Sequence, residues 1–472
     1  MTLRAACLVM ATALLGACHT APRQTAGALT FDVPAGWEGA PGLLADAPAA
    51  TPALAQWWDG FNDPVLSQLV AQALDTNTSV RGARAALRQA RALRDVTAAG
   101  LSPALGSSAS AQRGRLAGRP TGNSFAVGLD ASWEADVFGG NRAALEGSEA
   151  DAAASAATLG DTQVSVAAEV ALNYIALRRA QARLQIATRN LASQWQTLQL
   201  TQWRQQAGLT TALEVEQART LVSQTHAQLS VLQAAIDQSR HTLAVLTGQP
   251  PAAQTALLTT VAPVPQPDDI LALSIPADTL RQRPDVRAAE FRVVASAAGV
   301  AQAAALRKPD FRLTGSIGLN ALTLGGLNAG GAVASTLLAG VSWPVFDAGA
   351  GRARVRAQQA ALEQSQTGYE AAVLTALRDV EDALTALHND RDRSDSLQQA
   401  ALSAANAALL ARQRYGSGLV DFQVVLETQR TQLNAQDSFA VAHADVSTDH
   451  VRLYKALGGG WQANAPDAGS AP

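Results

Sequence analysis

The feature that most constrains the fold of this 472-residue chain is an internal repeat. Val80-Arg81 matches Val286-Arg287 at an offset of 206 residues, and Gly248 matches Gly458 at an offset of 210 residues. The offset grows in small steps, as a duplication with short insertions would produce, so the sequence predicts two copies of one structural unit. Further matches join Pro103 to Pro309, Val137 to Val345, Arg142 to Arg352 and Gly208 to Gly418.

Each copy contains a pair of short segments with strand-like patterning. In 125–137, apolar residues from Phe125 to Val137 alternate with small, polar or acidic residues, and 311–319 shows the same alternation. A period of two predicts strands with one apolar face and one wet face. Less regular partner strands are expected at about 102–113 and 333–345. Trp133 and Trp343 fall near corresponding strand ends, as a membrane-interface girdle would require.

Long helices follow each pair of strands. Between Asn141 and Gln206 only Gly147 and Gly160 interrupt the helical pattern, and this span would reach about 100 Å at ~1.5 Å per residue. Apolar residues recur at alternating spacings of three and four, which predicts coiled-coil packing. This seam is predicted at Val170, Tyr174, Leu177, Gln181, Leu184, Thr188, Leu191, Trp195 and Leu198, and in the return helix at Val222, Thr225, Leu229, Leu232, Ile236, Ser239, Leu243 and Leu246. Helices 351–415 and 420–457 are predicted to form the second hairpin.

The N-terminus has the pattern of an exported lipoprotein. Ala5 to Leu15 form an apolar stretch too short to span a bilayer, and Leu15-Gly16-Ala17-Cys18 resembles a bacterial lipobox. The alternative is an ordinary cleavage site with a chance cysteine. We expect a covalent lipid on Cys18, and His19 in place of an aspartate favours the outer membrane.

These signals divide the chain into six predicted segments. Residues 1–17 are a signal peptide and 18–60 a lipid-anchored extended segment. Residues 61–249 are the first repeat, 250–275 a Pro-rich linker, 276–460 the second repeat and 461–472 a C-terminal tail.

Four alternating strands are too few to close a membrane sheet. An open edge in lipid leaves backbone groups unpaired, and single-chain barrels have at least about eight strands. The chain is therefore expected to pool strands with copies of itself. Three copies would supply twelve strands, whereas two would supply eight around a lumen filled by side chains.

Five motifs in order resemble those of the TolC-like, OprM/NodT-type outer membrane factors of tripartite efflux pumps. The resemblance covers nearly the whole mature chain. The motifs are Trp57-Trp58-x-x-Phe61-x-Asp63-Pro64, Trp133-Glu134-x-Asp136-x-Phe138-Gly139, Arg283-Pro284-Asp285-Val286, Pro344-x-Phe346-Asp347-x-Gly349, and the run from Arg414-Tyr415-x-x-Gly418 to Lys455-Ala456-Leu457-Gly458-Gly459-Gly460-Trp461.

The resemblance implies an α+β membrane protein that is internally duplicated. Each chain would contribute four strands to a trimeric 12-stranded β-barrel and two hairpins to a long periplasmic α-helical coiled-coil barrel. The implied partners are a periplasmic adaptor, an inner-membrane resistance-nodulation-division (RND) pump and outer-membrane lipid. The implied function is export of drugs or other small molecules.

The same resemblance places a gate near the ends of the hairpins. The turns at Gly208 and Gly418 would form the periplasmic tip that docks the adaptor. Gln423 and Glu427 match the inward constriction positions, with Arg430 one turn further, although the family type has an aliphatic residue where Gln423 stands. Tyr415 and Arg430 resemble positions that link neighbouring helices in the closed state. Three Glu427 carboxylates near one axis would repel one another and attract cations. The alternative is that Glu427 is a solvated surface charge.

Other chemistry has no coherent pattern in the sequence. A formal net charge of −3 gives no indication of nucleic-acid binding. The six histidines lack zinc-ligand spacing, and there is no glycine-rich phosphate loop. We therefore expect no enzyme activity, no metal and no cofactor beyond the lipid on Cys18. The alternatives are a component of type I protein secretion or of heavy-metal efflux and, more remotely, a scaffolding lipoprotein of the periplasm.

Overall fold

A computed structural model describes residues 31, 37, 54–114, 122–267, 282–328 and 333–461. Cys18, the signal peptide and the tail after Trp461 lie outside the described residues. The described chain divides into two compact units. The strand unit comprises 103–147 and 292–366, and the helical unit comprises the remaining described residues.

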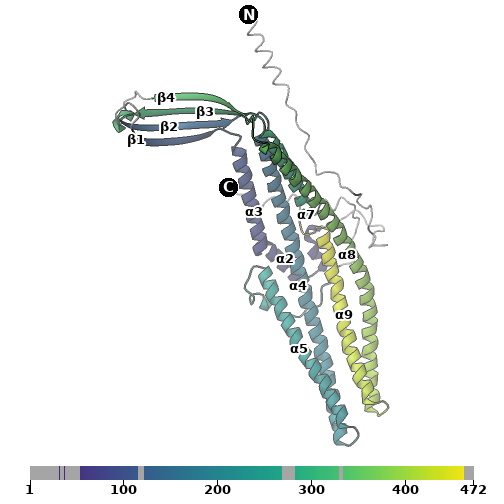
Figure 1. The fold of residues 1–472 in the computed structure, drawn as a ribbon. Helices are drawn as coiled ribbons and strands as arrows, with labels where there is room; N and C mark the ends of the chain where they lie inside the picture. Colours follow the sequence, from purple (N-terminus) through teal and green to yellow (C-terminus); the bar gives the residue numbers. More distant parts are fainter. Residues whose placement is uncertain are drawn as a thin grey trace. The chain divides into compact units, whose positions relative to one another are not determined.

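The elements occur in two successive copies, which confirms the internal duplication (Figure 1). In each copy the helix immediately before the strands has 22 residues, the long helix 67 and the return helix 35. The first copy contains η1 (Leu54–Phe61), α2 (Pro64–Thr76), α3 (Thr78–Ala99), β1 (Ala104–Gly114), β2 (Gly122–Glu134), α4 (Gly140–Gln206) and α5 (Ala212–Leu246). The short α6 (Thr255–Leu258) follows, and the second copy contains α7 (Pro284–Ala305), β3 (Asp310–Ala321), η3 (Leu324–Asn328), β4 (Val333–Ser342), α8 (Ala350–Gly416) and α9 (Phe422–Ala456).

The strand unit is built on one antiparallel sheet in the order β1-β2-β3-β4. Val127 of β2 lies opposite Leu319 of β3, and Phe311 of β3 lies opposite Val341 of β4. Within this chain β1 and β4 are the edge strands. Apolar side chains of the inner strands stay exposed, with Val127 48% and Ile317 53% accessible, so a single chain does not cover this surface.

The four strands are confirmed, but two of their predicted ends were wrong. β2 ends at Glu134 rather than residue 137, and β4 ends at Ser342 rather than residue 345, so Trp343 lies just beyond its strand. β2 ends early because of Asp136, which accepts hydrogen bonds from the backbone N–H groups of Asn141 and Arg142 at the start of α4. The strand therefore ends before this helix-capping carboxylate, although the alternation in the sequence continues. Asp347 serves the same role after β4 by accepting from Gly349 and Gly351.

The predicted seam of α4 holds over its first half and then shifts. Val170, Tyr174 and Leu177 are fully buried, whereas Thr188 and Trp195 are exposed. An α-helix has 3.6 residues per turn, so a strict repeat of 3.5 drifts around its surface. Beyond residue 181 the buried positions are Ala187, Asn190, Leu191, Gln194, Thr197, Leu198 and Thr201. The predicted seam of α5 is confirmed, because its members are buried or half-buried.

The core of the helical unit joins the two ends of the described chain. Trp57 stacks on Tyr454 with 5.2 Å between ring centroids, and the backbone N–H of Gly460 donates to Leu54 O at 2.7 Å. Gly160 lies opposite the Trp461 ring, and a Cβ there would come within 2.5 Å of Trp461 Nε1. This close approach explains a glycine in the middle of a 67-residue helix.

Among the described residues, no helix combines the length with the apolarity that crossing a membrane requires.

Candidate functional site

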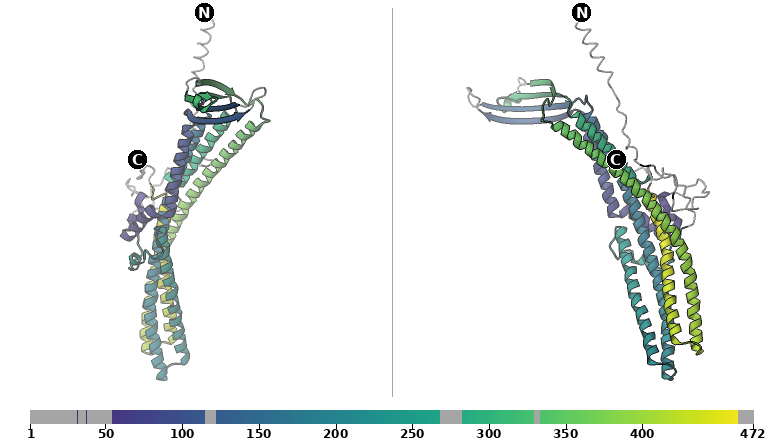
Figure 2. Two further views of the ribbon diagram at one scale, coloured as in Figure 1. Left: turned by 90° about the vertical axis from the view of Figure 1, so that its left-hand side faces the viewer. Right: turned by 45° about the vertical axis from the view of Figure 1, so that its right-hand side comes forward.

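Two glycine turns end the long helices of the helical unit at its hairpin tips (Figure 2). Gly208 and Gly418 both have φ of +72°, and the residue after each donates a backbone hydrogen bond to the carbonyl five residues earlier. This is the Schellman motif, in which a left-handed glycine satisfies the last carbonyls of a helix. Leu209 and Leu419 follow these glycines and are 69% and 73% exposed, so each tip presents one apolar side chain.

Tyr415 joins four helices near these turns. It lies in α8, its ring is 5.7 Å from the Phe422 ring of α9, and the Arg204 guanidinium of α4 lies 4.5 Å from its centroid. Arg204 Nη1 donates to the Tyr415 carbonyl at 2.9 Å, and the Tyr415 hydroxyl donates to Glu214 Oε2 of α5 at 3.4 Å. Burial, together with the Glu214 charge, raises the pKa of Tyr415, so its hydroxyl keeps the proton that it donates.

Gln423, Glu427 and Arg430 share one exposed face in the first turns of α9. Their spacing of four and then three residues puts the three side chains in a row along the helix. Gln423 Nε2 donates to Gln217 Oε1 of α5 at 2.9 Å, so this side chain bridges the two hairpins. Glu427 and Arg430 lie on the surface of the single chain. The opposite face of α9 is buried and carries Val425, Leu426 and Gln429.

The sequence reasoning missed a ladder of polar contacts between α4 and α9. Arg183 binds Asp437 through two hydrogen bonds of 2.7 and 2.9 Å, Asn190 Nδ2 donates to Gln436 at 2.8 Å, and Gln429 Nε2 donates to Thr197 at 2.8 Å. Arg183, Asn190 and Thr197 recur every seven residues along α4, and this spacing of polar residues was a visible signal. Their partners lie more than 200 residues away in the sequence, and no local pattern names them.

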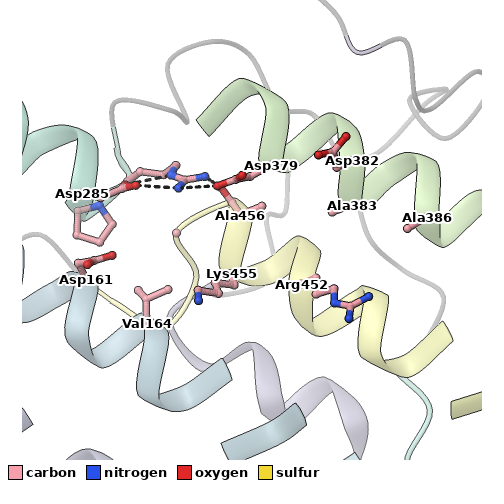
Figure 3. Close-up of a pocket in the computed structure, with 13 residues that line it drawn as sticks. Asp161, Val164, Asp285, Asp379, Asp382, Ala383, Ala386, Arg452, Lys455 and Ala456 are labelled. Carbon is pink, nitrogen blue, oxygen red and sulfur yellow. Dashed lines mark hydrogen bonds and ion pairs between the residues drawn. The ribbon is translucent and has the colours of Figure 1, made fainter. Parts of the chain in front are cut away.

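Arg283, Asp285 and Asp379 are among the residues that line a pocket of about 440 Å³ in the helical unit. Figure 3 shows the two aspartates at this pocket. Arg283 is 8% exposed, binds both oxygens of Asp285 at 3.0 and 2.8 Å, and donates to the Ala456 carbonyl at 2.8 Å. Its second carboxylate neighbour is Asp379, 3.4 Å away on α8. Burial alone would raise the pKa of Asp285, but hydrogen bonds and charge from Arg283 lower it below the ordinary value. The Arg283-Pro284-Asp285 motif therefore holds α7, α8 and the end of α9 together.

Within the described ranges, no three or more histidine, cysteine or acidic side chains gather in a way that could hold a metal ion.

Comparison with known proteins defines the class. The family model "Outer membrane efflux protein" matches residues 69–249 and 275–459. The pyoverdine export outer membrane protein OpmQ of Pseudomonas putida is 33% identical over 99% of this chain and 100% of its own length. The toluene efflux pump outer membrane protein TtgF of Pseudomonas putida is 32% identical over 86% of this chain and 85% of its own length.

The fold is similar to that of a solved outer-membrane channel. The solved outer-membrane channel OprN superposes with a TM-score of 0.84 and 36% identity, covering 91% of this chain and 98% of that chain. Long helical hairpins with a small antiparallel sheet are thus a fold that this chain shares with an outer-membrane channel. The chain belongs to the outer membrane efflux protein family. It is an outer-membrane channel component of an efflux system, with a periplasmic helical part.

Proposed function

We propose that three copies of this chain form one closed duct, with twelve strands in the outer membrane and six helical hairpins in the periplasm. The observation that carries this proposal is the four-stranded sheet, whose edge strands β1 and β4 have no partner strand in the described chain. Each unpaired backbone group of a strand edge costs several kcal/mol in lipid. Pairing β1 of one copy with β4 of the next satisfies these groups. The repeats 61–249 and 276–460 then contribute equal shares of the wall, joined by the linker 250–275.

The duct works with a periplasmic adaptor and an inner-membrane pump of the RND type, and exports drugs or other small molecules. OpmQ and TtgF are named for pyoverdine and toluene, which are both small molecules. This favours small-molecule efflux over type I protein secretion, heavy-metal efflux or a scaffolding role. The duct performs no bond chemistry and needs no cofactor, because the pump supplies the energy. The adaptor docks at the turns of Gly208 and Gly418, where Leu209 and Leu419 are exposed.

In this duct, Gln423 and Glu427 form the periplasmic constriction, with Arg430 one turn further. Two features support this assignment: all three side chains are exposed on one face of α9, and they lie next to the Gly418 turn. Tyr415 holds the constriction closed through Glu214 and Arg204, because these contacts bind the two hairpins together. Three Glu427 carboxylates around one axis would make the constriction selective for cations.

The gate is tested by Glu427→Ala combined with Gln423→Ala. We expect a rise in single-channel conductance in planar bilayers, because the substitutions remove the charged ring and the Gln423–Gln217 contact. Glu216→Ala is the control, since it removes an exposed carboxylate of α5 outside the gate motif. A conductance that stays at the parent value in the double variant refutes the assignment.

The lipid anchor is a separate proposal with its own test. Cys18→Ser is expected to abolish incorporation of radiolabelled palmitate, because the variant lacks the sulfur atom to which the lipid is attached. Cys7→Ser should leave labelling unchanged, since Cys7 falls within the predicted signal peptide. Equal labelling of the Cys18→Ser variant and the parent would show that the lipobox resemblance is accidental.

A further inference from the structure

A buried carboxyl pair joins α8 to α9 within the helical unit. Asp449 of α9 is 1% exposed, and Asp390 of α8 lies within hydrogen-bonding reach of it. Arg452 Nη1 donates to Asp449 Oδ1 at 2.9 Å. The other oxygen, Asp449 Oδ2, is buried and accepts no hydrogen bond from the described residues. A buried carboxylate oxygen without a donor is costly, and most such atoms in proteins are paired.

The cations near the pair are engaged by other groups. On α8, Arg393 Nε lies 3.3 Å from Asp390 Oδ1, while its Nη2 donates to Asp445 of α9 at 2.6 Å. On α4, Arg179 Nη1 donates to the other oxygen of Asp445 at 3.2 Å. Arg393 is therefore shared between Asp390 and a third carboxylate, Asp445, which Arg179 also binds.

Among the described residues, no other side chain donates a hydrogen bond to Asp449 Oδ2. Arg391 of α8 faces His450 of α9, with 3.1 Å between Nη2 and Nε2. Arg452 is committed to Asp449 Oδ1, and its side chain is 60% exposed, so solvent screens its charge. The Asp390 carboxyl group lies within hydrogen-bonding reach of Asp449, and two ionised carboxylates in contact repel.

We propose that Asp390 and Asp449 form a proton-binding site, in which one shared proton bonds α8 to α9. A proton between the two carboxyl groups satisfies Asp449 Oδ2 and removes one of the two facing charges. The sharing of one proton by two adjacent carboxylates is a known solution for such pairs. The site is distinct from the proposed gate, because Asp449 lies near the C-terminal end of α9 and Glu427 in its second turn.

The direction of the pH effect follows from the groups around Asp449. Burial, then the hydrogen bond and charge of Asp390, raise the pKa of Asp449 to about 7 against the opposing effect of Arg452. The folded chain therefore holds a proton that the unfolded chain has released above about pH 4. Stability must then fall as the pH rises from about 4 to about 7, and stay at the lower level above that.

Infrared spectroscopy of the full-length protein in detergent tests the site directly. Titration from about pH 5 to about pH 9 begins above the ordinary carboxyl pKa of about 4, so ordinary carboxyl groups stay ionised throughout. The parent should show the C=O stretch of a protonated carboxylic acid at acid pH and lose it near neutrality. Asp449→Asn should lack this band, because asparagine keeps the shape and an acceptor for Arg452 but has no acidic proton. The matched control is Asp392→Asn, an exposed aspartate two residues from Asp390, which should retain the band.

Thermal unfolding supplies the second readout. The midpoint of the parent should decrease from acid to neutral pH more steeply than that of Asp449→Asn, whose amide donates to Asp390 at every pH. If Asp449→Asn does not fold, Asp390→Asn carries the same comparison, since Asp390 is only half-buried. A carboxylic acid band that survives both substitutions, or parallel pH profiles in parent and variant, overturns the proposal.

Discussion

Replacing Arg283 with alanine is expected to lower the free energy of unfolding of the helical unit by about 3–5 kcal/mol, the range measured when one partner of a buried ion pair is removed. The guanidinium is 8% exposed and joins three groups at once: Asp285, Asp379 and the carbonyl of Ala456. Alanine would leave Asp285 half-buried without its cation and the Ala456 carbonyl without its donor. Three helices would lose their common contact.

The measurement is the thermal midpoint of the purified protein, followed by helical circular dichroism. Arg378→Ala is the matched control, because Arg378 also binds Asp379, at 2.9 Å, but its side chain is 65% exposed. An exposed pair of this kind contributes about 0–1 kcal/mol. Equal losses in the two variants would contradict the role assigned to Arg283.

The Arg283 contact also predicts a loss of stability in acid. Arg283 holds the pKa of Asp285 below its ordinary value, so the folded chain resists protonation of this carboxyl. The stabilisation is complete above the ordinary aspartate pKa of about 4 and declines as the pH falls below it. The Arg283→Ala variant should show less of this acid sensitivity than the parent.

Gly248→Ala is expected to have the second large effect, a loss of about 2–5 kcal/mol from left-handed backbone strain and overpacking together. Gly248 has φ of +68°, which strains any residue with a Cβ. A Cβ there would also lie 2.6 Å from the backbone oxygen of Thr76, an atom that cannot rotate away. The neighbouring Asn77 side chain donates to Leu246 O at 2.8 Å, so the contact holds α5 against the α2–α3 junction.

Gly208→Ala is the control for this substitution. Gly208 ends α4 in the same motif with φ of +72°, but a Cβ there would meet nothing within 4 Å. Its alanine variant should therefore lose only the backbone term of roughly 1–2 kcal/mol. The difference between the two thermal midpoints isolates the contact with Thr76. If both variants lose the same stability, that contact contributes nothing.

Local patterns were enough to predict most of the fold. The offsets that join Gly208 to Gly418 and Gly248 to Gly458 predicted the duplication, and all four glycines adopt the left-handed turn. Alternation predicted four strands, and the proline-free span from Asn141 to Gln206 predicted α4 to within one residue. These features depend on neighbours in the sequence, because helix and strand periods act over a few residues.

Predictions failed where a contact from outside the local pattern intervened. The alternation in 125–137 continues past the end of β2, but Asp136 caps α4 instead. The seam of α4 shifts after Gln181, where Asn190 and Thr197 find partners on α9. The periodic pattern of a segment shows which face of a helix or strand a residue occupies. It does not show which residue of another segment packs against that face.

The sequence by itself therefore determined the repeat, the strand number, the helix lengths and the positions of the turns. It also placed Gln423, Glu427 and Arg430 on one helix face, since their spacing follows the helical period. Only the tertiary structure decided the pairings, such as Arg183 with Asp437, Tyr415 with Glu214 and Asp390 with Asp449. These partners lie 59 to 254 residues apart, and the packing of whole helices brings them together. Burial between packed helices, which no single segment creates, also gives Asp449 its raised pKa.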